Sequence, residues 1–151
     1  MRSSGNFGVD SIFYTGSRYP RARDMTQDLP KMSRKVGASV PVVGVDDLLH
    51  VVEEGAHIVC VELAVNAVSL PEYQHPENAF YLFGPEDGTL PQCIIDRADD
   101  VIFVPTIGCM NLAATVNVVL YDRSIQFPPA RAGNELIEHS RDRNNNVEVK
   151  L

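Results

Sequence analysis

Five short apolar runs punctuate the chain as far as Val104, and they predict the strands of a β-sheet. The runs are rich in β-branched and aromatic residues and occupy Ser11–Tyr14, Val40–Val43, His57–Val61, Ala79–Phe83 and Val101–Val104. Most of them are apolar at consecutive positions rather than at alternate ones. This pattern is typical of strands that are covered on both faces in a parallel sheet.

Segments with apolar positions three and four residues apart lie between and after these runs, and they predict helices. Val45–Val52 has this spacing, with Asp46 placed for an N-cap. Leu90–Ala98 predicts a short helix with Pro91 in its first turn, and Cys109–Arg123 predicts the longest helix. The alternation of strands and helices predicts an α/β fold with a parallel sheet.

The Cys109–Arg123 segment is apolar nearly all round. Such a helix is buried in the core or in a subunit interface, and because a small domain has few places to bury a whole helix, the segment favours a homodimer. Beyond Pro128 and Pro129, Gly133–Arg143 predicts one amphipathic helix that is followed by a frayed tail. We therefore expect one domain over residues 1–127 and a polar C-terminal extension over residues 128–151.

The composition of the 151-residue chain, 44% hydrophobic and 22% charged, is that of an ordinary globular domain and excludes collagen and wholesale disorder. No stretch approaches the ~18 apolar residues of a membrane span, and no apolar secretory segment follows Met1. The three cysteines form no C-x-x-C pair, and the four histidines lack metal-ligand spacing. These features predict a reduced, cytoplasmic protein that binds neither a membrane nor a metal.

The net charge of −7 argues against indiscriminate binding to nucleic acid, because an acidic surface repels a polyanion at long range. Residues 18–35 nevertheless hold six basic and two acidic side chains, a local charge of +4 that leaves −11 elsewhere. Charges are screened over ~8 Å at physiological salt, so this segment can meet phosphate locally. A solvated charged loop is an equally good explanation of the same composition.

Two loops that leave predicted strands are candidate ligand sites. Residues 83–91, F-G-P-E-D-G-T-L-P, carry two glycines that let the backbone approach a ligand, and a carboxylate. Residues 104–112, V-P-T-I-G-C-M-N-L, open a helix that Cys109 or Asn111 could cap, with N–H groups free for a polar ligand. A plain turn explains either loop alone. On neighbouring parallel strands, however, the two would lie side by side.

The other candidate residues carry weaker signals. Arg2 stands one turn ahead of a Gly-rich approach to a strand, and an isolated arginine there is most often solvated. Cys109 has no histidine near it in the sequence to activate it as a nucleophile. The dinucleotide, P-loop, zinc-protease and nucleophile-elbow motifs are all absent from the chain.

Together, three segments resemble the SPOUT class of RNA methyltransferases, in particular its TrmH-like ribose 2′-O branch and the TrmL-type tRNA enzymes within it. Residues 2–14 resemble the end of the first motif, residues 83–90 resemble the second, F-G-P-E-x-x-G-L, and residues 104–122 resemble the third. The resemblance implies a parallel-sheet SPOUT fold with a C-terminal trefoil knot, an obligate homodimer and S-adenosyl-L-methionine as cofactor. In the family a strand and an N-x-G turn precede the arginine. This chain lacks both, so the first strand is expected to be missing, and Cys109 replaces the usual serine.

The resemblance also implies roles for individual residues. Arg2 stands where the family keeps its catalytic arginine, and Asn111 stands where it keeps the asparagine of the third motif. The cofactor would be held by Val61, Leu63, Gly84, Glu86, Gly88, Val104, Ile107, Cys109, Met110 and Leu112. The RNA would be held by Arg18, Arg21, Arg23, Arg34 and Lys35.

The leading hypothesis is therefore an S-adenosylmethionine-dependent RNA ribose 2′-O-methyltransferase that acts on tRNA. A second hypothesis is a catalytically impaired SPOUT-fold protein that binds RNA or a protein partner without turnover, which would follow from the expected absence of the first strand. A third, a flavodoxin-like or other small α/β binding domain, follows if the motif matches are accidental.

Overall fold

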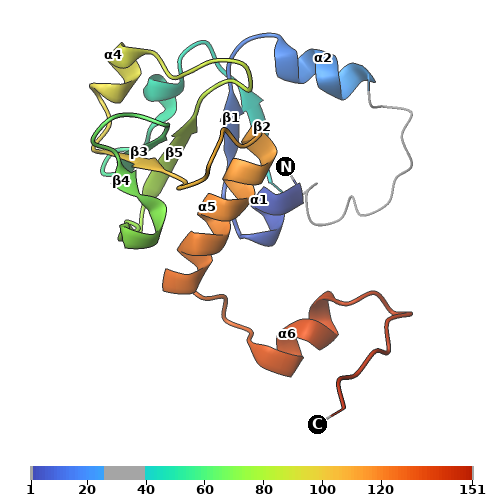
Figure 1. Ribbon diagram of the computed structural model, residues 1–151. Helices are drawn as coiled ribbons and strands as arrows, with labels where there is room; N and C mark the ends of the chain where they lie inside the picture. Colours follow the sequence, from blue (N-terminus) through green and yellow to red (C-terminus); the bar gives the residue numbers. More distant parts are fainter. Residues whose placement is uncertain (1, 26–39, 151) are drawn as a thin grey trace.

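The structure is a computed structural model that describes residues 2–25 and 40–150, and its strands form two parallel sheets (Figure 1). One sheet pairs β1 (Ile12–Tyr14) with β2 (Val42–Gly44). The other has the order β4 (Val68–Ser69), β6 (Asp100–Phe103), β3 (His57–Val61) and β5 (Ala79–Phe83). Every pairing among the described strands is parallel, which confirms the predicted α/β class.

The strand predictions succeed best at the centre of the larger sheet. Both β3 and β5 have the predicted ends, and their register places His57 opposite Ala79 and Val61 opposite Phe83. The other predicted strands, β1, β2 and β6, are displaced by one or two residues at an end. The sequence did not predict β4, because two residues are too few to show a pattern.

The helices depart further from the prediction. They are α1 (Arg2–Asn6), α2 (Arg18–Met25), α4 (Gln92–Ile95), α5 (Leu112–Gln126), α6 (Gly133–Ser140) and the short 3₁₀ helices η1 (Leu48–Val51) and η2 (Leu70–Glu72). The helix expected over Val45–Val52 is only η1. Its cap is Asp47 and not Asp46, since an Asp47 carboxylate oxygen accepts the backbone N–H of Leu49 at 2.8 Å.

The longest helix, α5, begins at Leu112, three residues later than predicted. Asn111 is extended and its side-chain oxygen accepts the N–H of Ala114 at 2.8 Å, which satisfies one of the free donors at the helix start. Only two α5 residues, Val119 and Leu120, are buried, so the core covers just part of this apolar helix.

Helices cover both faces of the four-stranded sheet, as expected for parallel strands. On one face Val59 and Ile102 pack with Val119 of α5. On the other face Cys60 and Leu82 pack with η1, and α4 packs beside them. Burial raises the pKa of the Cys60 thiol to about 11, so this cysteine is a core residue and not a reactive one.

A buried polar network anchors the C-terminal half of α5 to the sheet. The buried His75 ring places Nδ1 2.5 Å from Tyr81 Oη and Nε2 3.0 Å from an Asp122 carboxylate oxygen. Gln126 donates to the carbonyl of Tyr73 at 2.8 Å and accepts the N–H of His75 at 2.9 Å. Burial is the largest influence on the pKa of His75 and lowers it, as does the nearby Arg123 cation, while Asp122 raises it; the net pKa is lowered, so the ring is neutral at pH 7 in the fold.

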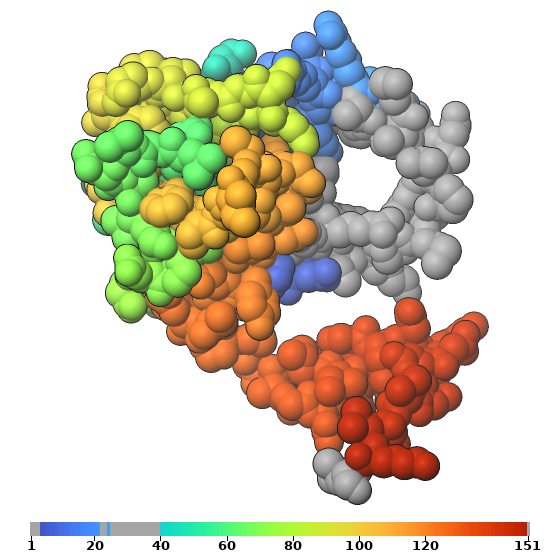
Figure 2. All heavy atoms as spheres, in the orientation of Figure 1, coloured from blue at the N-terminus to red at the C-terminus, as the bar shows by residue number. Residues whose placement is uncertain are grey.

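The C-terminal extension stands apart from the sheets (Figures 1 and 2). Its one helix, α6, has no buried residue, and the chain after it has no regular secondary structure up to residue 150. The helix predicted over Gly133–Arg143 is thus present and ends at Ser140. No helix in the described ranges has the length and apolar character that crossing a membrane requires.

Candidate functional site

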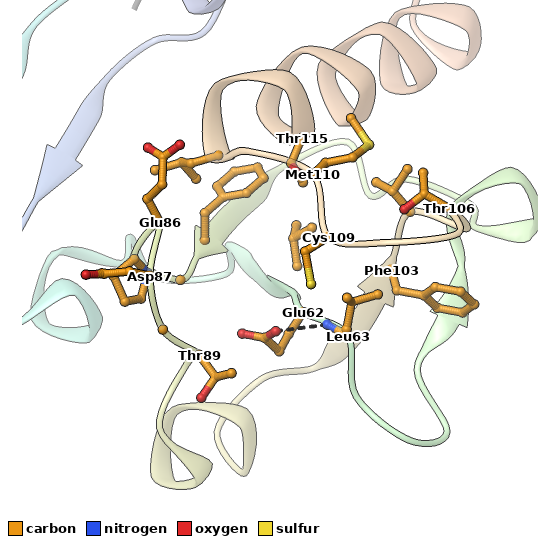
Figure 3. Close-up of a pocket in the computed structure, with 17 residues that line it drawn as sticks. Glu62, Leu63, Glu86, Asp87, Thr89, Phe103, Thr106, Cys109, Met110 and Thr115 are labelled. Atoms are coloured by element: carbon orange, nitrogen blue, oxygen red, sulfur yellow. Dashed lines mark hydrogen bonds between the residues drawn. The ribbon is translucent and has the colours of Figure 1, made fainter.

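Segments that follow the adjacent strands β5, β3 and β6 enclose a cavity of about 370 Å³ (Figure 3). Because the strands are parallel, their carboxyl ends meet at one edge of the sheet, where ligands bind in open α/β folds. The residues that line the cavity belong to three segments, 61–63, 83–89 and 103–115. The two loops that the sequence singled out therefore line the same cavity, but they do not follow neighbouring strands as expected, because β3 lies between β5 and β6.

Nine of the ten residues predicted to hold a cofactor line this cavity: Val61, Leu63, Gly84, Glu86, Gly88, Val104, Cys109, Met110 and Leu112. The tenth, Ile107, does not line it, and its side chain is fully exposed to solvent. In Figure 3 the thiol of Cys109 points into the cavity from the loop that precedes α5. The geometry thus gathers the predicted set without Ile107.

Of the two predicted catalytic residues, Asn111 is not among the described residues that line the cavity. Asn111 caps α5, so its side-chain oxygen is engaged while its amide N–H groups have no described partner. Arg2 begins α1, which packs against α5 (Figure 1). The side chain of Arg2 lies outside the described part of the structure.

The predicted RNA-binding residues are only partly described. Arg18 and Arg21 lie on α2, a helix that the sequence did not predict. Arg23 lies on the same helix, but its side chain is outside the described part of the structure, and so are Arg34 and Lys35 altogether.

Glu62, which sequence reasoning missed, joins two walls of the cavity. One carboxylate oxygen accepts the N–H of Leu63 at 2.9 Å, and the other accepts the N–H of Leu90 at 2.8 Å. The second bond spans from the end of β3 to the loop after β5. A glutamate that directly follows a buried strand is the only sequence signal for this role, and it does not reveal the partner at Leu90.

The two glycines of the loop after β5 are needed for close packing rather than for an unusual backbone angle. A Cβ atom on Gly84 would lie 3.3 Å from a Glu62 oxygen and 3.3 Å from the Leu90 nitrogen. A Cβ atom on Gly88 would lie 3.0 Å from Pro85. Neither glycine has a positive φ, so a plain turn that needs glycine for left-handed backbone is not the explanation.

An ion pair joins α2 to the rim of the cavity. Both guanidinium Nη atoms of Arg18 donate to the two carboxylate oxygens of Asp87, one of them at 2.8 Å. The hydrogen bond from Arg18 holds the pKa of Asp87 below its usual value. Both side chains are about two-thirds exposed, at 69% and 66%, so solvent and ligands can reach the pair.

The cavity combines apolar walls with negative charge. Figure 3 shows the Glu62 carboxylate pointing into it, while Glu86 and Asp87 point outward from its rim. No described lysine, arginine or histidine side chain lines the cavity. Groups of three or more metal-ligating side chains are likewise absent from the described residues. The site therefore suits a partly apolar ligand that carries positive charge.

Comparison with known proteins identifies relatives at the level of family and fold. The model of the SpoU rRNA Methylase family matches residues 1–121. A search of curated proteins finds no match.

Solved structures with a similar fold include the TrmH/SpoU tRNA modifying enzyme of A. aeolicus, with 19% identity, a TM-score of 0.60 and coverage of 91% of this chain and 75% of that one. A structure described as giving insights into the 2-OH methylation of C/U34 on tRNA has 23% identity and a TM-score of 0.65, covering 85% and 80%. The SpoU methyltransferase AviRb from Streptomyces viridochromogenes, in complex with AdoMet, has 19% identity and a TM-score of 0.65, covering 86% and 52%.

Proposed function

The chain belongs to the SpoU rRNA methylase family, and we propose that it transfers a methyl group from S-adenosylmethionine to a ribose 2′-hydroxyl of tRNA. The observation that carries this proposal is that the loops after β3, β5 and β6 share one cavity. The names of two similar structures support the choice of substrate, since one is a tRNA modifying enzyme and the other concerns methylation of tRNA.

The residues that line the cavity fit the proposed cofactor. Its volume of about 370 Å³ lies in the range of small-molecule sites. Apolar side chains such as Val61, Leu63 and Leu112 suit an adenine ring. The carboxylates and the lack of described basic side chains favour a ligand with a sulfonium and an ammonium group.

When bound, S-adenosylmethionine supplies an electrophilic methyl group on its sulfonium sulfur. Transfer of that group by in-line displacement depends mainly on positioning, which the loops provide by holding ligand groups in fixed places. The 2′-hydroxyl is a poor nucleophile until its proton passes to the adjoining RNA phosphate or to water and its developing negative charge is stabilised. We assign this role to the guanidinium of Arg2 and to the free amide N–H of Asn111, whose position the N-cap fixes.

A homodimer forms part of the proposal. The exposed face of α5 presents Val118, Tyr121 and Ile125 at spacings of three and four residues, and the last two side chains are 62% and 64% exposed. An apolar helix face of this kind is typical of a subunit interface.

Methyl transfer from tritiated S-adenosylmethionine to bulk tRNA tests the activity, followed by digestion and mass spectrometry of the nucleosides. We expect label in a 2′-O-methylated nucleoside, and we expect Arg2→Ala to abolish the transfer while the Kd for the cofactor stays within about twofold. Cofactor binding without methylation of any RNA would overturn the enzymatic role in favour of an RNA-binding protein. Equal transfer by Arg2→Ala would remove Arg2 from the mechanism.

A further inference from the structure

A second cavity, of about 490 Å³, lies at the carboxyl ends of β1 and β2, and none of the roles assigned above uses it. The residues that line it include Tyr14, Ser17, Pro20 and Asp46. No lysine, arginine or histidine is among the described residues that line it. An aromatic ring beside a carboxylate residue suits a flat group that carries hydrogen-bond donors.

Two neighbours hold the ring of Tyr14 in place. A Cβ atom on Gly44 would lie 3.0 Å from the Cζ and Oη atoms of Tyr14, so the ring lies directly on the glycine of β2. The Tyr19 ring packs against it with centroids 4.5 Å apart and planes inclined by 57°. Aromatic side chains fixed in this way are the surfaces on which proteins stack the bases of single-stranded nucleic acid.

The second cavity adjoins the first. Arg18 follows β1 by four residues, Asp87 follows β5 by four residues, and the two side chains are ion-paired. Phe13 of β1 and Phe80 of β5 also have ring centroids 6.0 Å apart. The carboxyl ends of the two sheets therefore face the same side, with Arg18 between the cavity at Tyr14 and the cavity lined by Asp87.

We propose that the second cavity binds a base of the RNA substrate, with the base stacked on Tyr14 and its donor edge facing Asp46. This inference rests on the proposed function, since only an RNA-binding protein needs such a site. A carboxylate accepts hydrogen bonds and donates none, so it favours guanine, adenine and cytosine over uracil, whose single N–H lies between two carbonyl groups. Arg18 is exposed on the same rim, and its guanidinium leaves the ion pair with Asp87 to bind the RNA phosphate next to that base.

Equilibrium binding of bulk tRNA tests the stacking surface with a matched pair of variants. Tyr14→Leu keeps apolar bulk but removes the ring, and we expect it to weaken binding roughly tenfold. Tyr14→Phe keeps the ring, and we expect it to bind as the wild type does. Unchanged affinity for S-adenosylmethionine in both variants shows that each is folded. Affinity for tRNA that is the same in Tyr14→Leu as in the wild type overturns the inference.

Competition by short homopolymers tests the base preference. We expect oligo(A) and oligo(C) to displace tRNA from the wild type at about tenfold lower concentration than oligo(U) does. Asp46→Asn should remove this preference, because an amide both donates and accepts. Asp10→Asn, the same charge change at the amino end of β1, should retain it. Equal competition by oligo(U) and oligo(C) with the wild type overturns the inference, whereas a base preference without methyl transfer overturns only the enzymatic proposal.

Discussion

Glu62 is the residue whose replacement most directly probes how the first cavity is held together. Its carboxylate accepts backbone N–H groups from Leu63 at 2.9 Å and from Leu90 at 2.8 Å, and thereby ties the end of β3 to the loop after β5. Glu62→Gln keeps one accepting oxygen and replaces the other with an amide nitrogen, which cannot accept. Glu62→Ala removes both acceptors.

Hydrogen bonds to a charged group contribute about 1.5–3 kcal/mol each. Water reaches the exposed N–H of Leu63 and replaces part of that loss, whereas the N–H of Leu90 is partly buried. We therefore expect the free energy of unfolding to fall by about 1–2 kcal/mol in Glu62→Gln and by about 2–4 kcal/mol in Glu62→Ala. The walls must also be brought together again when the cofactor binds, so its Kd should rise about tenfold in Glu62→Gln.

Urea unfolding measures the first effect and titration calorimetry with S-adenosylmethionine measures the second. Glu54→Gln makes the same chemical change at an exposed site with no described hydrogen bond and should alter neither quantity. If Glu62→Ala unfolds at the wild-type midpoint and binds the cofactor with wild-type affinity, the two hydrogen bonds do not hold the cavity together.

Three further outcomes follow from the structure. His75 is buried with a lowered pKa, so its contribution to the free energy of unfolding should be present in full above about pH 6.5. As the pH drops below this value the unfolded chain takes up a proton, and the free energy of unfolding should fall. Urea unfolding should show this dependence on pH in His50→Asn but not in His75→Asn. Light scattering at micromolar concentration should give a dimer mass for the wild type and a monomer mass for Tyr121→Asp, and a monomeric wild type would contradict the proposed interface. Asn111→Asp keeps an N-cap acceptor and should unfold like the wild type but lose methyl transfer, whereas Asn111→Ala should also lose about 1 kcal/mol of stability; full activity in Asn111→Asp would exclude the amide from catalysis.

The sequence predicted the centre of the fold well because that part depends on local patterns. The runs over His57–Val61 and Ala79–Phe83 are apolar at every position except His57 and are rich in β-branched or aromatic residues, so even their ends were predicted correctly. The helix over Arg18–Met25 was missed because its charged residues form no apolar stripe. Asp47 and not Asp46 caps η1, a choice between neighbours that depends on backbone geometry.

The candidate site, too, could be predicted from the sequence only in part. The two loops could be found because glycine, proline and polar residues follow buried strands, and parallel strands bring such loops together. The position of Ile107 outside the cavity could not be predicted, since it depends on how the loop bends between Thr106 and Cys109. Glu62 and the Arg18–Asp87 pair were missed because each joins segments far apart in the sequence. The trefoil knot stays a prediction.

Protection of Cys109 from alkylation tests the central claim, that the cavity between the loops after β3, β5 and β6 holds S-adenosylmethionine. Cys109 lines the cavity and is exposed, Cys93 is exposed outside it, and Cys60 is buried with a raised pKa. With iodoacetamide and peptide mass spectrometry, a cofactor concentration about ten times its Kd should slow labelling of Cys109 about tenfold and leave Cys93 unchanged. Labelling of Cys109 at the same rate with and without the cofactor would contradict the account.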